Sequence, residues 1–151
     1  MHAFDKMARA ADKAALLKGG LPAGDRALKA FADAIQSEVT PPDVFARVGG
    51  EEFALILAGM DANQARGVAQ RLGDLVRVHP FVLDDGTVLH ATVSMGVCTL
   101  AAPQGPMPDL EVLLAQADAA LYQAKQLGRD RTCCVQASVQ PVRSTAAALA
   151  M

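Results

Sequence analysis

Apolar residues recur every three or four positions in several parts of the chain, and this spacing predicts amphipathic helices. A weak pattern of this kind lies in residues 1–19, before a break at Gly19-Gly20. A clearer pattern starts at Asp25 and ends before Pro41-Pro42. Its apolar stripe consists of Leu28, Phe31, Ala32, Ile35 and Val39.

Two further helices carry recognisable end signals. Asp61 precedes the third apolar stripe and Gln64 follows three residues later, which is the spacing of a reciprocal N-terminal cap. Asp109 precedes the fourth stripe and can cap it. Lys125 occupies the last turn of that stripe and Gly128 follows its end, as is typical of helix C-termini.

Shorter runs that are rich in β-branched and aromatic residues predict strands between these helices. Asp84-Asp85-Gly86 predicts a tight turn between two of them. Helices that alternate with strands, including a hairpin, predict an α+β domain in which helices pack on a mixed sheet. The predicted strands cover Val44–Val48, Phe53–Leu57, Pro80–Leu83, Val88–Leu89, Ala91–Leu100 and Arg131–Val135.

The chain of 151 residues is long enough for one domain with a sizeable core. We assign residues 20–135 to that domain and residues 1–19 to an atypical N-terminal segment. Residues 136–151 are rich in Ser, Ala and Thr, and this composition predicts a disordered tail.

Composition narrows the class of protein. A net charge of −2 gives no support for a broad nucleic-acid surface. No apolar run is long enough to cross a bilayer, and the first residues lack the apolar core of a secretory signal. Cys98, Cys133 and Cys134 have no metal-binding or redox spacing, which favours packing roles in a reducing compartment. We therefore expect a cytoplasmic protein.

The candidate chemistry lies on Gly49-Gly50-Glu51-Glu52, between the first two predicted strands. Gly49 and Gly50 can take positive φ and let a ligand approach the backbone. Glu51 and Glu52 on a turn can both reach one hard cation, and clustered carboxylates bind Mg²⁺ together with substrate phosphates. A hairpin turn with two solvated glutamates is the alternative interpretation of the same residues.

Several motifs in the same order resemble those of the GGDEF family, the diguanylate cyclases. Arg47-Val48-Gly49-Gly50-Glu51-Glu52-Phe53 resembles the signature hairpin of that family. Four further segments are similar to other motifs of the family. They are Gly24-Asp25, the strand from Thr92 to Gly96, the Ala-Asp-Ala-Ala-Leu-Tyr-Gln-Ala-Lys helix that ends at Lys125, and Gly128-Arg129-Asp130. The resemblance covers about Gly20 to Cys134 and implies the palm-like fold of the nucleotidyl cyclases.

The resemblance also implies an activity, the condensation of two GTP molecules to cyclic di-GMP by two domains that face each other in a homodimer. It implies Mg²⁺ (or Mn²⁺) as cofactor, with Glu51 and Glu52 as metal ligands and Glu52 as the group that assists attack by the 3′-hydroxyl. Gly49 and Gly50 would leave room for the nucleotide, and Asp25 would contact the guanine edge. Lys125 and Arg129, one helical turn apart in the sequence, would hold the triphosphate.

Simpler structural roles stay open for three of these residues. Asp25 can be a helix cap. Lys125 and Arg129 can complement the dipole of a helix C-terminus.

The beginning of the chain departs from the family pattern. The family has a central strand with a metal-binding aspartate and then a guanine-binding asparagine, and these positions fall on Ala8 and Leu16. Residues 1–19 contain no β-branched run that could replace the strand, so its neighbours are expected to lack ladder partners. A truncated or degenerate chain that serves as an inactive binding module therefore remains the alternative to an enzyme.

Overall fold

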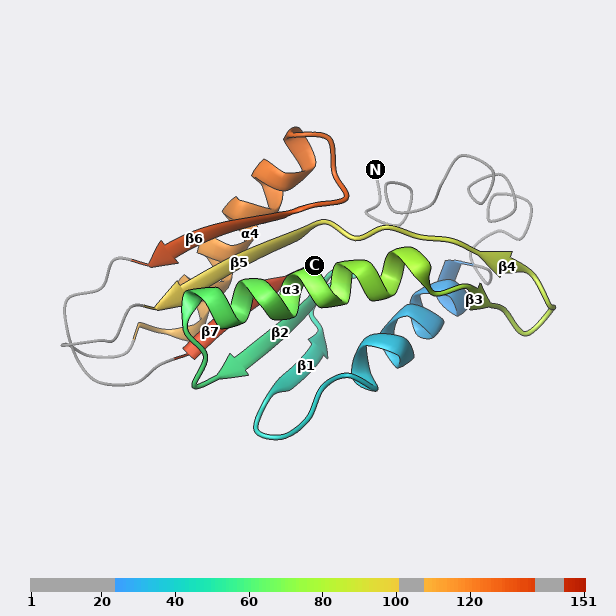
Figure 1. Ribbon diagram of the computed structural model, residues 1–151, viewed down its shortest axis with the longest axis horizontal. Coiled ribbons are helices and arrows are strands. Elements are labelled where there is room, and N and C mark those ends of the chain that lie inside the picture. The colour runs from blue at the N-terminus through green and yellow to red at the C-terminus, as the bar shows by residue number, and fades with distance from the viewer. Residues whose placement is uncertain (1–23, 101–107, 138–145) are drawn as a thin grey trace.

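A computed structural model describes residues 24–100, 108–137 and 146–151 of the chain (Figure 1). A helix covers residues 24–36 and precedes the first strand. The later elements are β1 (Val44–Arg47), β2 (Phe53–Ala58), α3 (Ala62–Val78), β3 (Phe81–Val82), β4 (Val88–Leu89), β5 (Met95–Leu100), α4 (Leu110–Gln126), β6 (Thr132–Ala137) and β7 (Ala146–Ala150). The described helices include none that is long and apolar enough to span a membrane.

The main sheet has five strands in the order β1-β2-β7-β5-β6, and β3 and β4 form a separate two-stranded hairpin. β5 and β6 are parallel, whereas the other neighbours in the main sheet are antiparallel. The predicted α+β fold with a mixed sheet is confirmed.

The central place in this sheet belongs to β7, from the far end of the sequence. Ala54 to Ala58 of β2 pair with Ala150 to Ala146, and Gly96 to Thr99 of β5 pair with Ala150 to Ala147. The expectation that β2 and β5 would lack ladder partners is therefore wrong. The predicted disordered tail is also wrong for residues 136–137, which end β6, and for residues 146–151. The atypical segment 1–19 lies outside the described residues.

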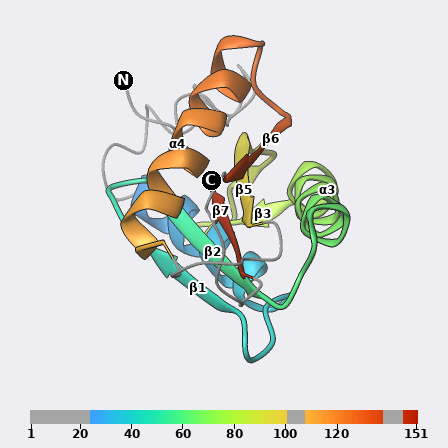
Figure 2. The same ribbon diagram turned by 90° about the vertical axis from the view of Figure 1, so that its left-hand side faces the viewer.

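Helices cover both faces of the sheet (Figure 2). α3 and the helix over residues 24–36 lie on one face, where Phe31, Ile35, Leu72 and Val76 are buried with Leu149 of β7. α4 lies on the other face, where Leu113, Ala117 and Leu121 are buried with Cys98 of β5. The sheet is thus the middle layer of the domain, and β7 contributes to both cores.

The local end signals are confirmed in part. Asp61 accepts from the Gln64 backbone N–H at 2.8 Å and the Gln64 side chain accepts from the Asp61 N–H at 2.9 Å, which completes the predicted reciprocal cap of α3. Asp109 is the N-cap residue of α4, but its side chain makes no capping hydrogen bond. The strand predicted over Ala91–Leu100 is shorter than expected, since β5 begins at Met95.

Candidate functional site

The glycine-glutamate motif lies on the turn of the β1–β2 hairpin, as predicted. The backbone N–H groups of Val48 and Gly49 both donate to the Glu52 carbonyl, at 2.9 and 3.2 Å. The Arg47 side chain crosses the turn, where its Nε donates to the Gly49 carbonyl at 3.2 Å and a terminal nitrogen donates to the Gly50 carbonyl. The turn is therefore held by its own backbone and by one arginine.

Neither glycine of the motif has a positive φ, so the left-handed conformation that these residues permit is not used here. A Cβ at Gly49 would lie 3.0 Å from Oε2 and 3.3 Å from Cβ of Glu52. A Cβ at Gly50 would meet nothing within 4 Å. Gly49 thus leaves the space over which the Glu52 side chain folds back, and a larger residue there would require that side chain to shift.

Glu52 lines a cavity of about 210 Å³ between the hairpin, α4 and β7. The walls are mainly apolar, and the two acidic residues that line the cavity come from different elements, Glu52 from the turn and Asp118 from α4. The apolar lining includes Phe53, Leu114, Leu121 and Ala150. The hairpin and α4, which are distant in the sequence, therefore present carboxylates to one cavity.

Asp118 is the site residue to which sequence analysis assigned no role. Partial burial raises its pKa, the nearby charge of Glu52 raises the pKa further, and the charge of Lys125 opposes both effects. Leu114, Asp118, Leu121 and Lys125 recur at spacings of four, three and four, which is one face of a helix. That spacing is the sequence signal that could have pointed to Asp118, because it places Asp118 on the same helix face as the predicted site residue Lys125.

Lys125 lies in the last turn of α4, but Arg129 lies beyond the end of the helix at Gln126. The expectation that they stand one helical turn apart is therefore wrong. Arg129 has φ 62° and follows Gly128 at φ 111°, and its N–H donates to the Ala124 carbonyl at 3.0 Å. A positive φ is energetically costly for residues other than glycine, and residues with such a φ are enriched at functional sites.

The Nε of Arg129 is buried and has no hydrogen-bond partner within the described part of the chain. A buried donor without a partner is unfavourable, and an anion bound at this loop would offset that cost. This observation fits a residue that holds a phosphate.

Asp25 is exposed in the first turn of the helix over residues 24–36 and does not line the cavity beside Glu52. Its neighbour Arg26 reaches Asp85 of the β3–β4 turn at 3.5 Å. Ala8 and Leu16, on which the resemblance places the metal-binding and guanine-binding positions, lie outside the described residues.

The donor set of the turn fits a magnesium ion that is delivered with a nucleotide. Within the described ranges there is no group of three or more His, Cys, Asp or Glu side chains that could hold a metal. Mg²⁺ commonly takes one or two carboxylates and completes its octahedron with phosphate oxygens and water. Glu51 and Glu52 supply hard oxygen ligands of this kind.

Asp118→Asn is expected to stabilise the protein at neutral pH. Because the pKa of Asp118 is raised in the folded state, the folded protein binds this proton more tightly, and stability falls as pH rises through that pKa. The gain is expected to be no more than about 1 kcal/mol, since the side chain is largely exposed and screened. Urea unfolding at pH 7 and at about pH 3, below the ordinary Asp pKa, measures it, and the gain should vanish at the lower pH.

Asp109→Asn is the matched control for this prediction, because it changes the same chemical group at the start of the same helix without touching the cavity. A Asp118→Asn protein that is less stable than the wild type at pH 7 would contradict the assignment.

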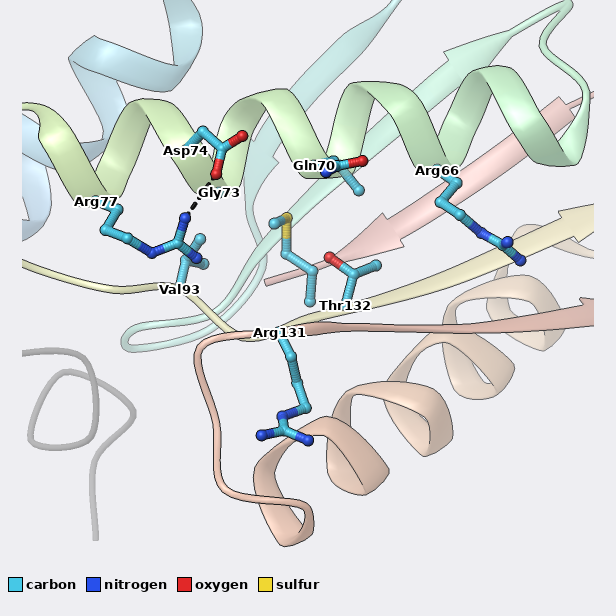
Figure 3. A pocket seen from close by; sticks show the side chains of 10 residues that line it. Arg66, Gln70, Gly73, Asp74, Arg77, Val93, Arg131 and Thr132 are labelled. Atoms are coloured by element: carbon cyan, nitrogen blue, oxygen red, sulfur yellow. Dashed lines mark hydrogen bonds and ion pairs between the residues drawn. The ribbon is translucent and has the colours of Figure 1, made fainter.

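A second cavity, of about 410 Å³, lies between α3 and the beginnings of β5 and β6 (Figure 3). Arg77 at its rim is paired with Asp74 at 2.6 Å and with Asp130 at 2.8 Å, so its charge is already balanced. None of the predicted site residues lines this cavity. It is therefore a weaker candidate than the cavity at the hairpin.

Comparison with known proteins gives a consistent result. The family model described as "Diguanylate cyclase, GGDEF domain" matches residues 18–131. The response regulator PleD of Caulobacter vibrioides is 38% identical over 108 residues, which are 71% of this chain and 23% of PleD. The probable diguanylate cyclase DgcF of Escherichia coli K12 is 35% identical over 114 residues, 75% of this chain and 36% of DgcF.

Among solved structures, the GGDEF domain of DgcB from Caulobacter crescentus, in complex with c-di-GMP, superposes with a TM-score of 0.69. The two sequences are 27% identical, and the match covers 85% of this chain and 74% of that one. The matches span 23% of PleD and 36% of DgcF, so the chain covers only a part of the length of these relatives.

Proposed function

Because this chain belongs to the GGDEF family of diguanylate cyclases, we propose that it condenses two molecules of GTP to cyclic di-GMP with Mg²⁺ or Mn²⁺. The reaction takes place between two copies of the domain, each of which holds one GTP. The observation that carries this proposal is the Glu52 carboxylate, which lines a cavity bounded by the hairpin turn and by α4.

The condensation takes place in two steps, and each step forms one phosphodiester bond. The 3′-oxygen of one GTP bonds to the α-phosphorus of the other, and the bond from that phosphorus to pyrophosphate breaks. The hydroxyl proton passes to the Glu52 carboxylate, which acts as the general base. Since there is little further covalent chemistry for the protein to perform, most of the rate enhancement comes from positioning and charge.

The remaining residues bind and orient the nucleotide. Glu51 and Glu52 would hold the metal ion, which when bound offsets negative charge on the phosphates. Lys125 and Arg129 would hold the triphosphate, and the buried unpartnered Nε of Arg129 supports this role. Asp25 would accept hydrogen bonds from the guanine edge. Gly49 keeps space open in which the Glu52 side chain folds over the turn.

The dimer follows from the chemistry. One domain holds one nucleotide, and a cyclic dinucleotide needs two reciprocal attacks, so two domains must face each other. We place the activity in the cytoplasm because GTP is its substrate.

The proposal predicts a product that can be identified directly. Purified protein incubated with GTP and Mg²⁺ should yield cyclic di-GMP, identified by mass spectrometry, and EDTA should abolish its formation. Because two domains must meet, the rate per domain should rise with protein concentration until the dimer is saturated.

GTP-dependent thermal stabilisation without any product would instead indicate a binding module that has lost catalysis. A protein that neither forms product nor is stabilised by GTP would overturn the proposal.

A further inference from the structure

The segment from Ala146 to Met151 lies outside residues 18–131, which the family model matches, yet it lies directly beside the catalytic turn. The Phe53 N–H donates to the Met151 carbonyl at 3.2 Å, and the Met151 N–H donates to the Phe53 carbonyl at 3.0 Å. Phe53 immediately follows Glu52. The end of β7 is therefore fixed to the residue next to the proposed general base.

The side chains of residues 148–151 alternate between the two faces of the sheet. Leu149 and Met151 are buried in the core on the side of α3. Ala148 and Ala150 are buried on the opposite side, in the cluster that contains Ala117 and Leu121 of α4. The two alanines thus lie two residues apart in the same cluster, on the face of the sheet that packs against α4.

Only one of the two alanines reaches the site. Ala150 lines the cavity that holds Glu52 and Asp118, whereas Ala148 does not line it. Ala150 has 5% of its surface exposed and Ala148 has 1%, so both side chains are buried. The two positions differ in their surroundings: the Ala150 side chain borders the cavity, whereas the Ala148 side chain is enclosed by the packed side chains of the cluster.

We propose that β7 supplies a wall of the nucleotide pocket and that Ala150 sets the size of that pocket, so that residues beyond the family match determine how tightly GTP binds. This inference rests on the proposed function, because it takes the cavity beside Glu52 as part of the GTP site. A larger side chain at position 150 would occupy space that the magnesium-bound nucleotide needs.

The test compares Ala150→Val with Ala148→Val. Each substitution adds the same two methyl groups. Ala148→Val should lower the melting temperature at least as much as Ala150→Val, because the added groups meet packed protein at position 148 and enter the cavity at position 150. Binding of GTP with Mg²⁺, measured by calorimetry, should weaken about tenfold or more for Ala150→Val and change less than about twofold for Ala148→Val. A folded Ala150→Val protein that binds GTP as tightly as Ala148→Val would overturn the inference.

A second measurement covers the case in which Ala150→Val does not fold. Ala150→Cys and Ala148→Cys are each made together with Cys133→Ser and Cys134→Ser, which removes the two cysteines that are not buried. A small methanethiosulfonate reagent should label position 150 faster than position 148 in the folded protein, and GTP with Mg²⁺ should slow only the labelling at 150.

The labelling outcomes separate the two proposals. Faster labelling at 150 without protection by GTP would show that the cavity is accessible but is not part of the GTP site, which overturns this inference. The proposed function would then be judged separately, by whether the protein forms cyclic di-GMP. Equal labelling at the two positions overturns the role of Ala150 alone.

Discussion

Gly96→Ala is expected to abolish the cooperative unfolding transition of this protein. Gly96 lies in β5, directly under α4, and a Cβ there would lie 2.0 Å from the Ala117 carbonyl oxygen and 2.3 Å from the Leu121 backbone nitrogen. These atoms belong to the helix backbone and cannot rotate away as a side chain can. One added methyl group would therefore force α4 off the sheet.

The expected loss exceeds that of ordinary overpacking, which is about 1–3 kcal/mol. It is comparable to the whole stability of a small domain, about 5–15 kcal/mol, because the separation of α4 from the sheet opens the core around Leu113, Ala117 and Leu121. Thermal unfolding followed by circular dichroism measures the effect.

Gly67→Ala is the matched control. Gly67 is exposed within α3, and a Cβ there would meet nothing within 4 Å. The same substitution should stabilise the protein by up to about 1 kcal/mol, the difference in helix propensity between the two residues. A Gly96→Ala protein that melts cooperatively near the wild-type temperature would show that α4 can shift without loss of the core.

The same contact explains why two motifs that are distant in the sequence belong together. Gly96 ends the strand motif from Thr92, and Ala117 and Leu121 belong to the helix motif that ends at Lys125. The glycine allows the helix backbone to approach, and this approach brings Asp118 to the cavity beside Glu52. Resemblance to a family identified the two motifs separately, whereas the packing shows that they form one unit.

Local patterns were sufficient to predict most of the fold. The hairpin, the reciprocal cap of α3 and the apolar faces of both long helices depend on residues within one or two turns of each other. β7 could not be predicted in this way, because alanine is depleted in strands and a run rich in Ser, Thr and Ala is typical of disorder. Its place depends on small side chains facing α4 and larger ones facing the opposite core.

The residues of the candidate site differ in the same way in how far the sequence could predict them. The acidic turn could be predicted, since glycines followed by glutamates between two strands are contiguous in the sequence. Asp118 could be aligned with Lys125 on one face of a helix, but its place beside Glu52 could not be predicted. Ala150 could not be predicted at all, because the cavity is formed by three elements that only the tertiary structure brings together. The position of Arg129 was mispredicted because α4 ends at Gln126, before a loop with positive φ.

Glu52→Gln is expected to reduce the formation of cyclic di-GMP by about a thousandfold or more, within the range of about 10²–10⁴ for loss of a general base together with weaker binding of the metal ion. Glutamine has nearly the same size and shape as glutamate, so the side chain can still fold over Gly49 and line the cavity. An amide, however, cannot take the proton of a 3′-hydroxyl and is a poorer ligand for Mg²⁺.

The Glu52→Gln variant should therefore fold as the wild type does. Because the substitution removes the charge that raises the pKa of Asp118, the melting temperature of the variant should be unchanged or slightly higher. Glu111→Gln, at an exposed position in the first turn of α4, is the control for a carboxylate lost outside the cavity, and it should keep nearly full activity. Product formation at saturating GTP and Mg²⁺ measures both variants. If Glu52→Gln retained more than about a tenth of the wild-type rate, Glu52 would not be the base, and Glu51 on the same turn would become the carboxylate to replace next.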